Sequence, residues 1–163
     1  MKYFGQIFIF VLSGLINYGC KAPASQKLSG SDQINRFESS FIRLEKQECY
    51  GTCPVYNITV YGTGKVEYEG KKHIKREGKF KKELSSQEIN QLFNAYECAN
   101  FFDFKSEYDE PDLQDLPTTY VTFKHRGFEK RIKDYYNAPD ELKHLEKMVE
   151  KIAESEEGWT PAE

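Results

Sequence analysis

The stretch that decides the fold runs from residue 55 to residue 68 and reads Val-Tyr-Asn-Ile-Thr-Val-Tyr-Gly-Thr-Gly-Lys-Val-Glu-Tyr. Apolar side chains recur at every second position on both sides of the glycines: Tyr56, Ile58, Val60, Val66 and Tyr68. A period of two with β-branched and aromatic residues predicts half-buried antiparallel strands. The segment Gly62-Thr63-Gly64 suits a hairpin turn between them, because such a turn needs positive φ.

The same alternation continues on both sides of this hairpin. Ile42 and Leu44 share one face of a strand that begins near Phe41. A further extended segment is expected over residues 72–82, with Gly78 as a bulge or bend. Two more strands are expected at residues 118–124 and 128–136, on either side of a turn.

Two segments carry helical patterns. Ser85 and Glu88 have the spacing of a capping box, and Leu84 and Ile89 flank them as a hydrophobic staple. This helix should fade near residues 101–104. The second helix is expected to begin around Pro139, which is well placed in a first turn. The apolar positions that we expect the two helices to bury are Ile89, Leu92, Phe93, Tyr96, Leu142, Leu145, Val149 and Ile152.

The resulting order, ββββ-α-ββ-α, predicts an α+β fold with an antiparallel sheet of about six strands and two helices packed on one face. We expect this domain to cover residues 41–155 and a flexible tail to cover residues 156–163. The length of 163 residues suggests one domain, and 15 % aromatic residues exclude disorder of the whole chain. A net charge of -3 excludes a dedicated electrostatic nucleic-acid binder.

The first residues predict export. Lys2 precedes an apolar stretch that ends in Gly19-Cys20, and the stretch is short for a membrane span. The placement of Cys20 after Gly19 resembles the lipobox of bacterial lipoproteins, although Asn17 stands where that family has leucine. The resemblance implies a signal peptide at residues 1–19 and a lipid on Cys20. Ordinary secretion and an uncleaved anchor are the alternatives. Residues 20–40 have the composition of a flexible tether.

The cysteines are the most chemically specific feature of the domain. Cys49 and Cys53 are separated by three residues including Gly51, which permits the reversal that a disulfide needs. A structural disulfide is the leading interpretation, and a redox-active pair is an alternative. Cys98 is expected to be a buried free thiol or to pair with Cys49 or Cys53. A zinc site formed by the three cysteines and one of the three histidines, His73, His125 or His144, is a further alternative.

Two charged segments form a possible contact surface. A basic hairpin could contact lipid headgroups, glycan or an acidic partner. An acidic loop could contact a partner or bind calcium. The contact residues that we predict are Lys71, Lys72, Lys75, Arg76, Asp109, Asp112 and Asp115.

The stretch Cys49-x-Gly51-x-Cys53-Pro54-x-Tyr56, with the following Gly62-x-Gly64 turn, resembles the signature of a bacterial domain of unknown function. That domain occurs in exported proteins and lipoproteins. Later landmarks are also similar: Asp115-x-Pro117-Thr118, the Gly127 turn and the helix start at Pro139. The likeness covers roughly residues 41–152. It implies the compartment and the domain limits, and it carries over no activity.

No sequence motif of a hydrolase, metalloprotease, P-loop or Rossmann enzyme occurs in the chain. We therefore expect a non-enzymatic cell-envelope lipoprotein, exposed to the periplasm or the cell surface. Its partners would be the membrane, through the lipid anchor, and another envelope protein, with no cofactor and no nucleic acid. The alternatives are a thiol-redox or assembly factor using Cys49 and Cys53, and an ion- or ligand-binding module using the acidic loop.

Overall fold

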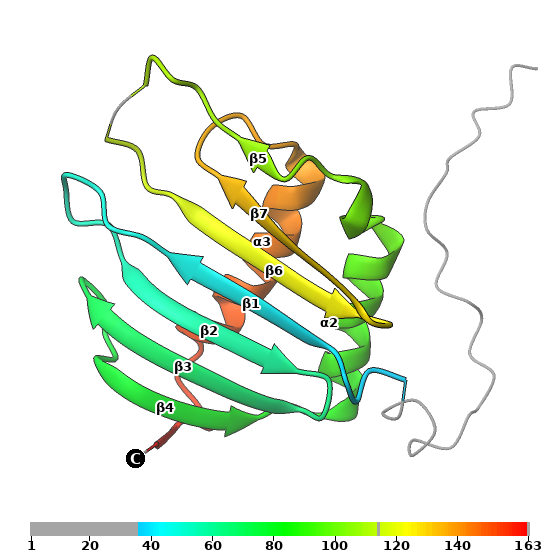
Figure 1. Cartoon of the computed structure of the whole chain (residues 1–163). Coiled ribbons are helices and arrows are strands. Elements are labelled where there is room, and N and C mark those ends of the chain that lie inside the picture. Colours follow the sequence, from blue (N-terminus) through cyan, green and yellow to red (C-terminus); the bar gives the residue numbers. More distant parts are fainter. Residues whose placement is uncertain (1–35, 114, 163) are drawn as a thin grey trace, which may run out of the picture.

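The structure is a computed structural model that describes residues 36–113 and 115–162. The predicted signal peptide, Cys20 and most of the predicted tether lie outside the described residues. Figure 1 shows the elements, which follow the chain as β1 (Phe41–Lys46), β2 (Val55–Tyr61), β3 (Lys65–Lys72), β4 (Gly78–Glu83), α2 (Ser86–Cys98), the 3₁₀ turn η1 (Phe101–Asp103), β5 (Glu107–Tyr108), β6 (Thr119–His125), β7 (Phe128–Asp134), α3 (Asp140–Glu154) and β8 (Thr160–Pro161). None of the helices in the described ranges is long and apolar enough to span a membrane.

All strands join one sheet in the order β5-β7-β6-β1-β2-β3-β4-β8. The six strands expected from alternation are β1 to β4, β6 and β7, and each pairs with its neighbours in the antiparallel sense. The strand count and the purely antiparallel character were wrong in detail. The edge strands β5 and β8 have two residues each, and β5 pairs with β7 in parallel. Two residues carry no periodicity, so alternation could not reveal these edges.

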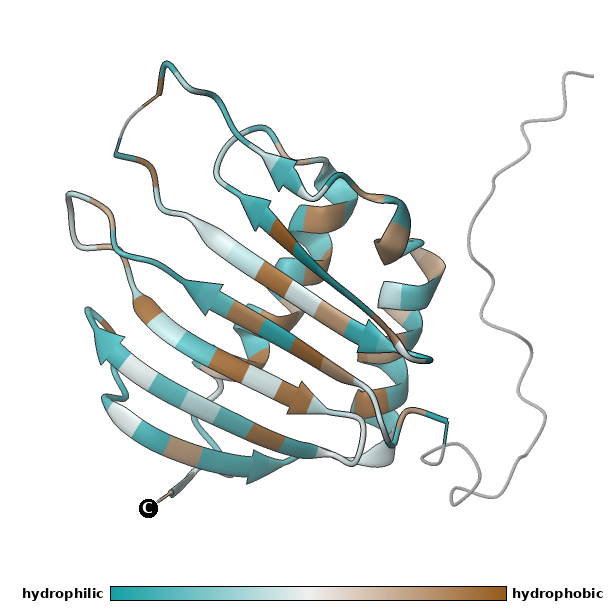
Figure 2. Ribbon diagram, viewed as in Figure 1, coloured by the Kyte–Doolittle hydropathy of each residue, from teal (hydrophilic) through white to brown (hydrophobic). Residues whose placement is uncertain are grey.

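Both helices pack on the same face of the sheet, which confirms that part of the expectation (Figure 1). Figure 2 shows hydrophobic and hydrophilic residues alternating along the central strands. Because successive side chains point to opposite faces, this alternation directs one apolar set toward the helices. The largest fully buried side chains include Phe37, Ile42, Leu44, Ile58, Ile89, Phe93, Tyr96, Phe123, Ile132, Leu142 and Leu145.

The predicted capping box forms at the start of α2. The Glu88 amide donates to Ser85 Oγ at 3.3 Å, and the Ser85 amide donates to Glu88 Oε2 at 2.8 Å. Leu84 and Ile89, the predicted staple, are both buried. At the second helix, Pro139 is the residue before the first helical turn. The helix starts were therefore predicted correctly from local sequence.

The packed body extends beyond the predicted limits at both ends. Phe37, which the sequence placed in the tether, has no exposed surface. Its carbonyl oxygen would lie 1.7 Å from a Cβ at Gly62, so this turn position admits only glycine. In the predicted flexible tail, the Trp159 ring lies 5.4 Å from that of Tyr68, and β8 pairs with β4. Long-range packing thus orders residues whose local composition is that of a linker.

Two carboxyl groups are buried together between β7 and α3. Asp134 is 1 % exposed and Glu146 is 4 % exposed, and each has one oxygen with no hydrogen-bond partner among the described residues. Lys143 binds the other Asp134 oxygen. Burial and the neighbouring Asp134 carboxylate raise the pKa of Glu146 to about 8. Glu146 is therefore held protonated at neutral pH.

This pair predicts that alkaline pH weakens the fold. The unfolded chain ionises Glu146 near its ordinary pKa of 4.5, whereas the folded chain retains the proton up to about pH 8. Stability should therefore fall as pH rises through this window. Glu146→Gln mimics the protonated acid, so it should flatten the decline and raise the free energy of unfolding at pH 9 by about 1 kcal/mol or more. Urea denaturation at several pH values measures both effects.

The matched control is Glu141→Gln, on the exposed side of the same helix. It should leave the pH profile of the wild-type protein unchanged. Equal pH slopes for the wild type and Glu146→Gln would contradict the assignment of a buried proton to Glu146.

Candidate functional site

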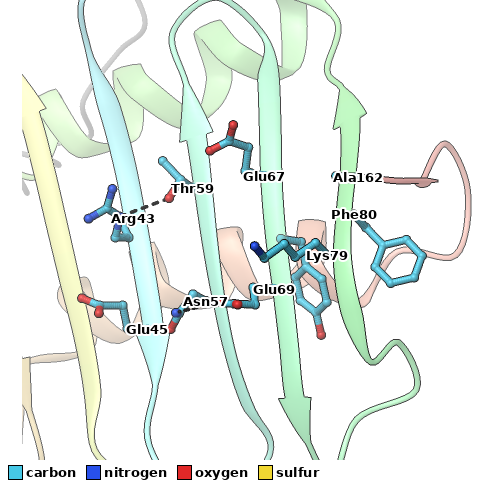
Figure 3. Close-up of a pocket in the computed structure, with 10 residues that line it drawn as sticks. Arg43, Glu45, Asn57, Thr59, Glu67, Glu69, Lys79, Phe80 and Ala162 are labelled. Atoms are coloured by element: carbon cyan, nitrogen blue, oxygen red, sulfur yellow. Dashed lines mark hydrogen bonds between the residues drawn. The ribbon is translucent and has the colours of Figure 1, made fainter.

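The candidate site is the sheet face that neither helix covers (Figure 1). Strands β1 to β4 direct every second side chain toward this open face, and these positions are mostly charged or polar. We call it the open sheet face. It is hollowed by a groove of about 480 Å³. Figure 3 shows residues that line the groove, which include Arg43, Glu45, Asn57, Thr59, Glu67, Glu69, Lys79, Phe80 and Ala162.

The carboxylates of the groove are neutralised by neighbours within the sheet. Arg131 Nη2 lies 3.0 Å from Glu45 Oε2. Glu67 accepts from the Tyr61 hydroxyl at 2.8 Å and lies 2.6 Å from Lys65 Nζ. Hydrogen bonds from Lys65 and Tyr61 lower the pKa of Glu67, so it is ionised at neutral pH. These acids have local partners and are not available as free negative charges.

Two cations of the groove remain without an acidic partner. Arg43 Nε donates to Thr59 Oγ1 at 3.1 Å, and this hydroxyl holds the guanidinium in place (Figure 3). Lys79 projects from β4 on the other side of the groove. Within the part of the chain that the structure describes, no carboxylate lies at ion-pair distance from Arg43 or Lys79. The groove therefore offers positive charge to an external ligand.

The predicted basic contact residues do not share one surface. Lys71 lies beside Glu69 on the open sheet face, at 3.9 Å. Lys72 pairs with Glu48 at 2.8 Å, and Lys75 pairs with Glu156 at 3.2 Å. Arg76 donates to two carbonyl oxygens at the end of α3. Each of these four cations thus has a partner within the domain, and Arg76 joins the loop between β3 and β4 to the end of α3.

The predicted acidic contact residues lie at the opposite edge of the sheet. Asp109 and Glu107 bind Lys133, which ties this loop to β7. Asp112 and Asp115 are exposed. Because β5 and β4 are near opposite ends of the strand order, the structure does not bring the basic and acidic sets together. No cluster of three or more metal-ligating side chains occurs in the described ranges.

Sequence reasoning missed Arg43 as a candidate site residue, and it placed Lys79 only in the basic hairpin, without naming it among the contact residues. Both occupy outward positions of alternating strands, so the period-two pattern placed them on the solvent side. A charged side chain on this face is paired or unpaired according to its neighbours on the adjacent strands. The sequence of a single strand does not reveal those neighbours.

The predicted disulfide is present between Cys49 and Cys53, with their Cα atoms 5.8 Å apart. The prediction for Cys98 was wrong: its side chain is exposed at the end of α2, and no cysteine among the described residues is free. The disulfide also excludes the alternative in which Cys98 pairs with Cys49 or Cys53. It removes two of the thiolates that the zinc alternative needs.

A serine before β1, a histidine at the end of β6 and a glutamate of α2 form a chain of hydrogen bonds. Ser40 Oγ lies 2.8 Å from His125 Nδ1, and His125 Nε2 lies 2.8 Å from Glu97 Oε1. Burial and the neighbouring Arg126 and Arg36 lower the pKa of His125. The neutral ring donates to Glu97 and accepts from Ser40, because a carboxylate only accepts. Ser40 is 2 % exposed, so its hydroxyl links chain segments and does not face a substrate.

A family model described as Domain of unknown function (DUF6438) matches residues 40–153, which run from the residue before β1 to the last turn of α3. No curated protein matches the chain.

The disulfide yields a prediction about stability. Replacing both cysteines, as Cys49→Ser with Cys53→Ser, should lower the free energy of unfolding by about 2 kcal/mol, because the unfolded loop gains freedom. Urea denaturation without reductant measures the change. Thr52→Ser, in the same exposed loop, is the control and should have no effect. A double variant as stable as the wild type would show that the bond does not stabilise the domain.

Proposed function

The chain belongs to the family described as Domain of unknown function (DUF6438), and we propose that it is an envelope lipoprotein that binds a partner protein on its open sheet face. The observation that carries the proposal is the groove with two cations, Arg43 and Lys79, that have no acidic partner among the described residues. The partner would present acidic side chains to this groove.

The geometry of the groove favours carboxylate recognition. Thr59 accepts from Nε of Arg43, which leaves the terminal guanidinium nitrogens for an external group. A guanidinium binds a carboxylate through two parallel hydrogen bonds, and an orienting contact reduces the entropy lost on binding. Glu45 is paired with Arg131, and Glu67 is paired with Lys65. A bound partner would therefore contact ion pairs whose positions are already set by the sheet. Complementary charges of this kind favour specificity and rapid association.

The proposal of a non-enzymatic role is supported by the position of the polar side chains. Ser40 and His125, which have the chemistry of a nucleophile and a base, are both buried. The groove contains carboxylates in ion pairs and no histidine or cysteine. These groups suit recognition of charge better than proton transfer.

The proposal of a lipid anchor rests on the N-terminal sequence. Lys2, the apolar stretch after it and Gly19-Cys20 are typical of an exported lipoprotein, and the segment that follows is rich in small and polar residues. An acyl chain on Cys20 would attach the protein to a membrane without a spanning helix.

Reversing the two cations tests the proposed binding face. Arg43→Glu with Lys79→Glu should abolish recovery of the partner when the tagged protein is isolated from cross-linked envelopes, because acidic side chains would then face acidic side chains. Lys151→Glu, an exposed residue on α3, makes a similar charge reversal on the helical side. It should leave recovery unchanged. Equal recovery with both variants would contradict the proposed face.

The intact mass of the native protein tests the anchor. We expect a chain that begins at Cys20 and carries acyl groups, and its mass should change on deacylation. Alkylation before and after reduction counts the disulfides in the same sample and shows whether Cys49 and Cys53 cycle between states. An unacylated chain, or one in which Cys20 forms a disulfide with Cys98, would contradict the lipoprotein proposal.

A further inference from the structure

A second pocket, of about 370 Å³, lies on the helical side of the sheet at the end of α3. The sheet contributes Tyr56 and Tyr68, the loop between β3 and β4 covers one side, and the last turn of α3 closes another. This volume is within the range of small-molecule sites. Lining residues include Lys46, Pro54, Tyr56, Tyr68, Ile74 and Arg76.

The two tyrosines have hydroxyl groups without protein partners. Tyr56 and Tyr68 are each 5 % exposed, and their rings lie 5.5 Å apart. Among the described residues, neither hydroxyl makes a hydrogen bond, and neither oxygen is fully enclosed by protein. A buried tyrosine hydroxyl normally has a partner. Because both oxygens reach the surface of the pocket and neither is used by the described residues, each hydroxyl can donate a hydrogen bond to a ligand bound there.

The pocket is preformed, because the loop that covers it is fixed. At Gly70 a Cβ would lie 1.9 Å from the Arg76 carbonyl oxygen and 2.2 Å from Ile74 Cδ1, so only glycine permits the loop to pack on β3. Arg76 donates to the carbonyl oxygens of Ala153 at 3.1 Å and Ser155 at 3.0 Å. These bonds join the loop to the end of α3.

Three cations and three carboxylates line the pocket, and four of these six side chains form two ion pairs. Lys46 pairs with Glu150, and Lys75 pairs with Glu156. Burial, together with Glu150 and Glu154, raises the pKa of Tyr56, so its hydroxyl stays a neutral donor. The nearby carboxylates disfavour a ligand anion at this hydroxyl. Pro54, Ile74 and the tyrosine rings provide apolar walls.

We propose that this pocket binds an uncharged small molecule with a planar apolar body and a carbonyl acceptor. The acceptor receives hydrogen bonds from the hydroxyls of Tyr56 and Tyr68, and the body packs between the aromatic rings and Ile74. Tyr68 lines both this pocket and the groove of the open sheet face, whereas Tyr56 and Ile74 line this pocket and are absent from the groove.

Trp159 provides a direct signal for this site. It is the single tryptophan of the chain, and its ring contacts that of Tyr68 at 5.4 Å. Titration of the purified full chain with N-benzylbenzamide, a neutral amide with two rings, should change the Trp159 fluorescence in a saturable way. The probe 4-benzylbenzoate has a similar size and carries a negative charge, so it should bind at least tenfold more weakly.

Variants at two tyrosines of β2 locate the binding. Tyr56→Phe removes a hydroxyl that has no protein partner, so the fold should remain as stable as the wild type. Its Kd for N-benzylbenzamide should rise about fivefold to tenfold, as expected for one lost hydrogen bond. Tyr61→Phe is the control, because Tyr61 bonds Glu67 on the open sheet face, and its Kd should equal that of the wild type.

Three results would overturn the proposal. The first is no saturable response to N-benzylbenzamide, and the second is equal affinity for 4-benzylbenzoate. The third is an unchanged Kd in Tyr56→Phe. Loss of partner recovery in the open-face variants is a separate observation and decides nothing about this pocket.

Discussion

The packing of α2 and α3 on a single face of the sheet is the contact on which the rest of the structure depends. Aromatic rings carry the α2 part of this packing: the Phe37 and Phe93 centroids lie 4.9 Å apart, and those of Tyr96 and Phe123 lie 5.3 Å apart. The α3 part is carried by buried aliphatic side chains such as Leu142 and Leu145. Since strand residues alternate, burying one apolar set leaves a polar set facing water. The open sheet face follows from this division. The second pocket forms where α3 ends and the sheet tyrosines continue.

Local sequence predicted the main strands and helices well. It did not predict the two ends of the packed domain or the short edge strands of the sheet. The alternation around Ile58 and the capping box at Ser85 depend on neighbours within a few residues, so the chain displays them directly. Phe37 and Trp159 are ordered by contacts far along the chain, and their surroundings have linker composition. The parallel pairing of β5 with β7 likewise depends on where the loop after η1 returns.

The candidate sites were less predictable than the fold, because each is defined by side chains that have no ion-pair or hydrogen-bond partner among the described residues. Alternation places Arg43 outward, but only the assembled sheet shows that no described carboxylate reaches it. Tyr56 has the pattern of an ordinary core residue, and its hydroxyl becomes distinctive only when no partner is found. The link from Ser40 to His125 spans 85 residues, with no signal in either neighbourhood. The cysteine pair was predictable because both partners lie in one turn.

The central position of β1 has a mechanical consequence. The first strand of the domain is β1, which is paired along its whole length with β2 on one side and β6 on the other. A pulling force at the N-terminus acts along this strand, so both ladders bear the load together in shear. Edge strands such as β8 would instead peel away one bond at a time. The domain should therefore resist unfolding by a force applied at its N-terminal side. A much smaller force at its C-terminal side should be enough to detach β8.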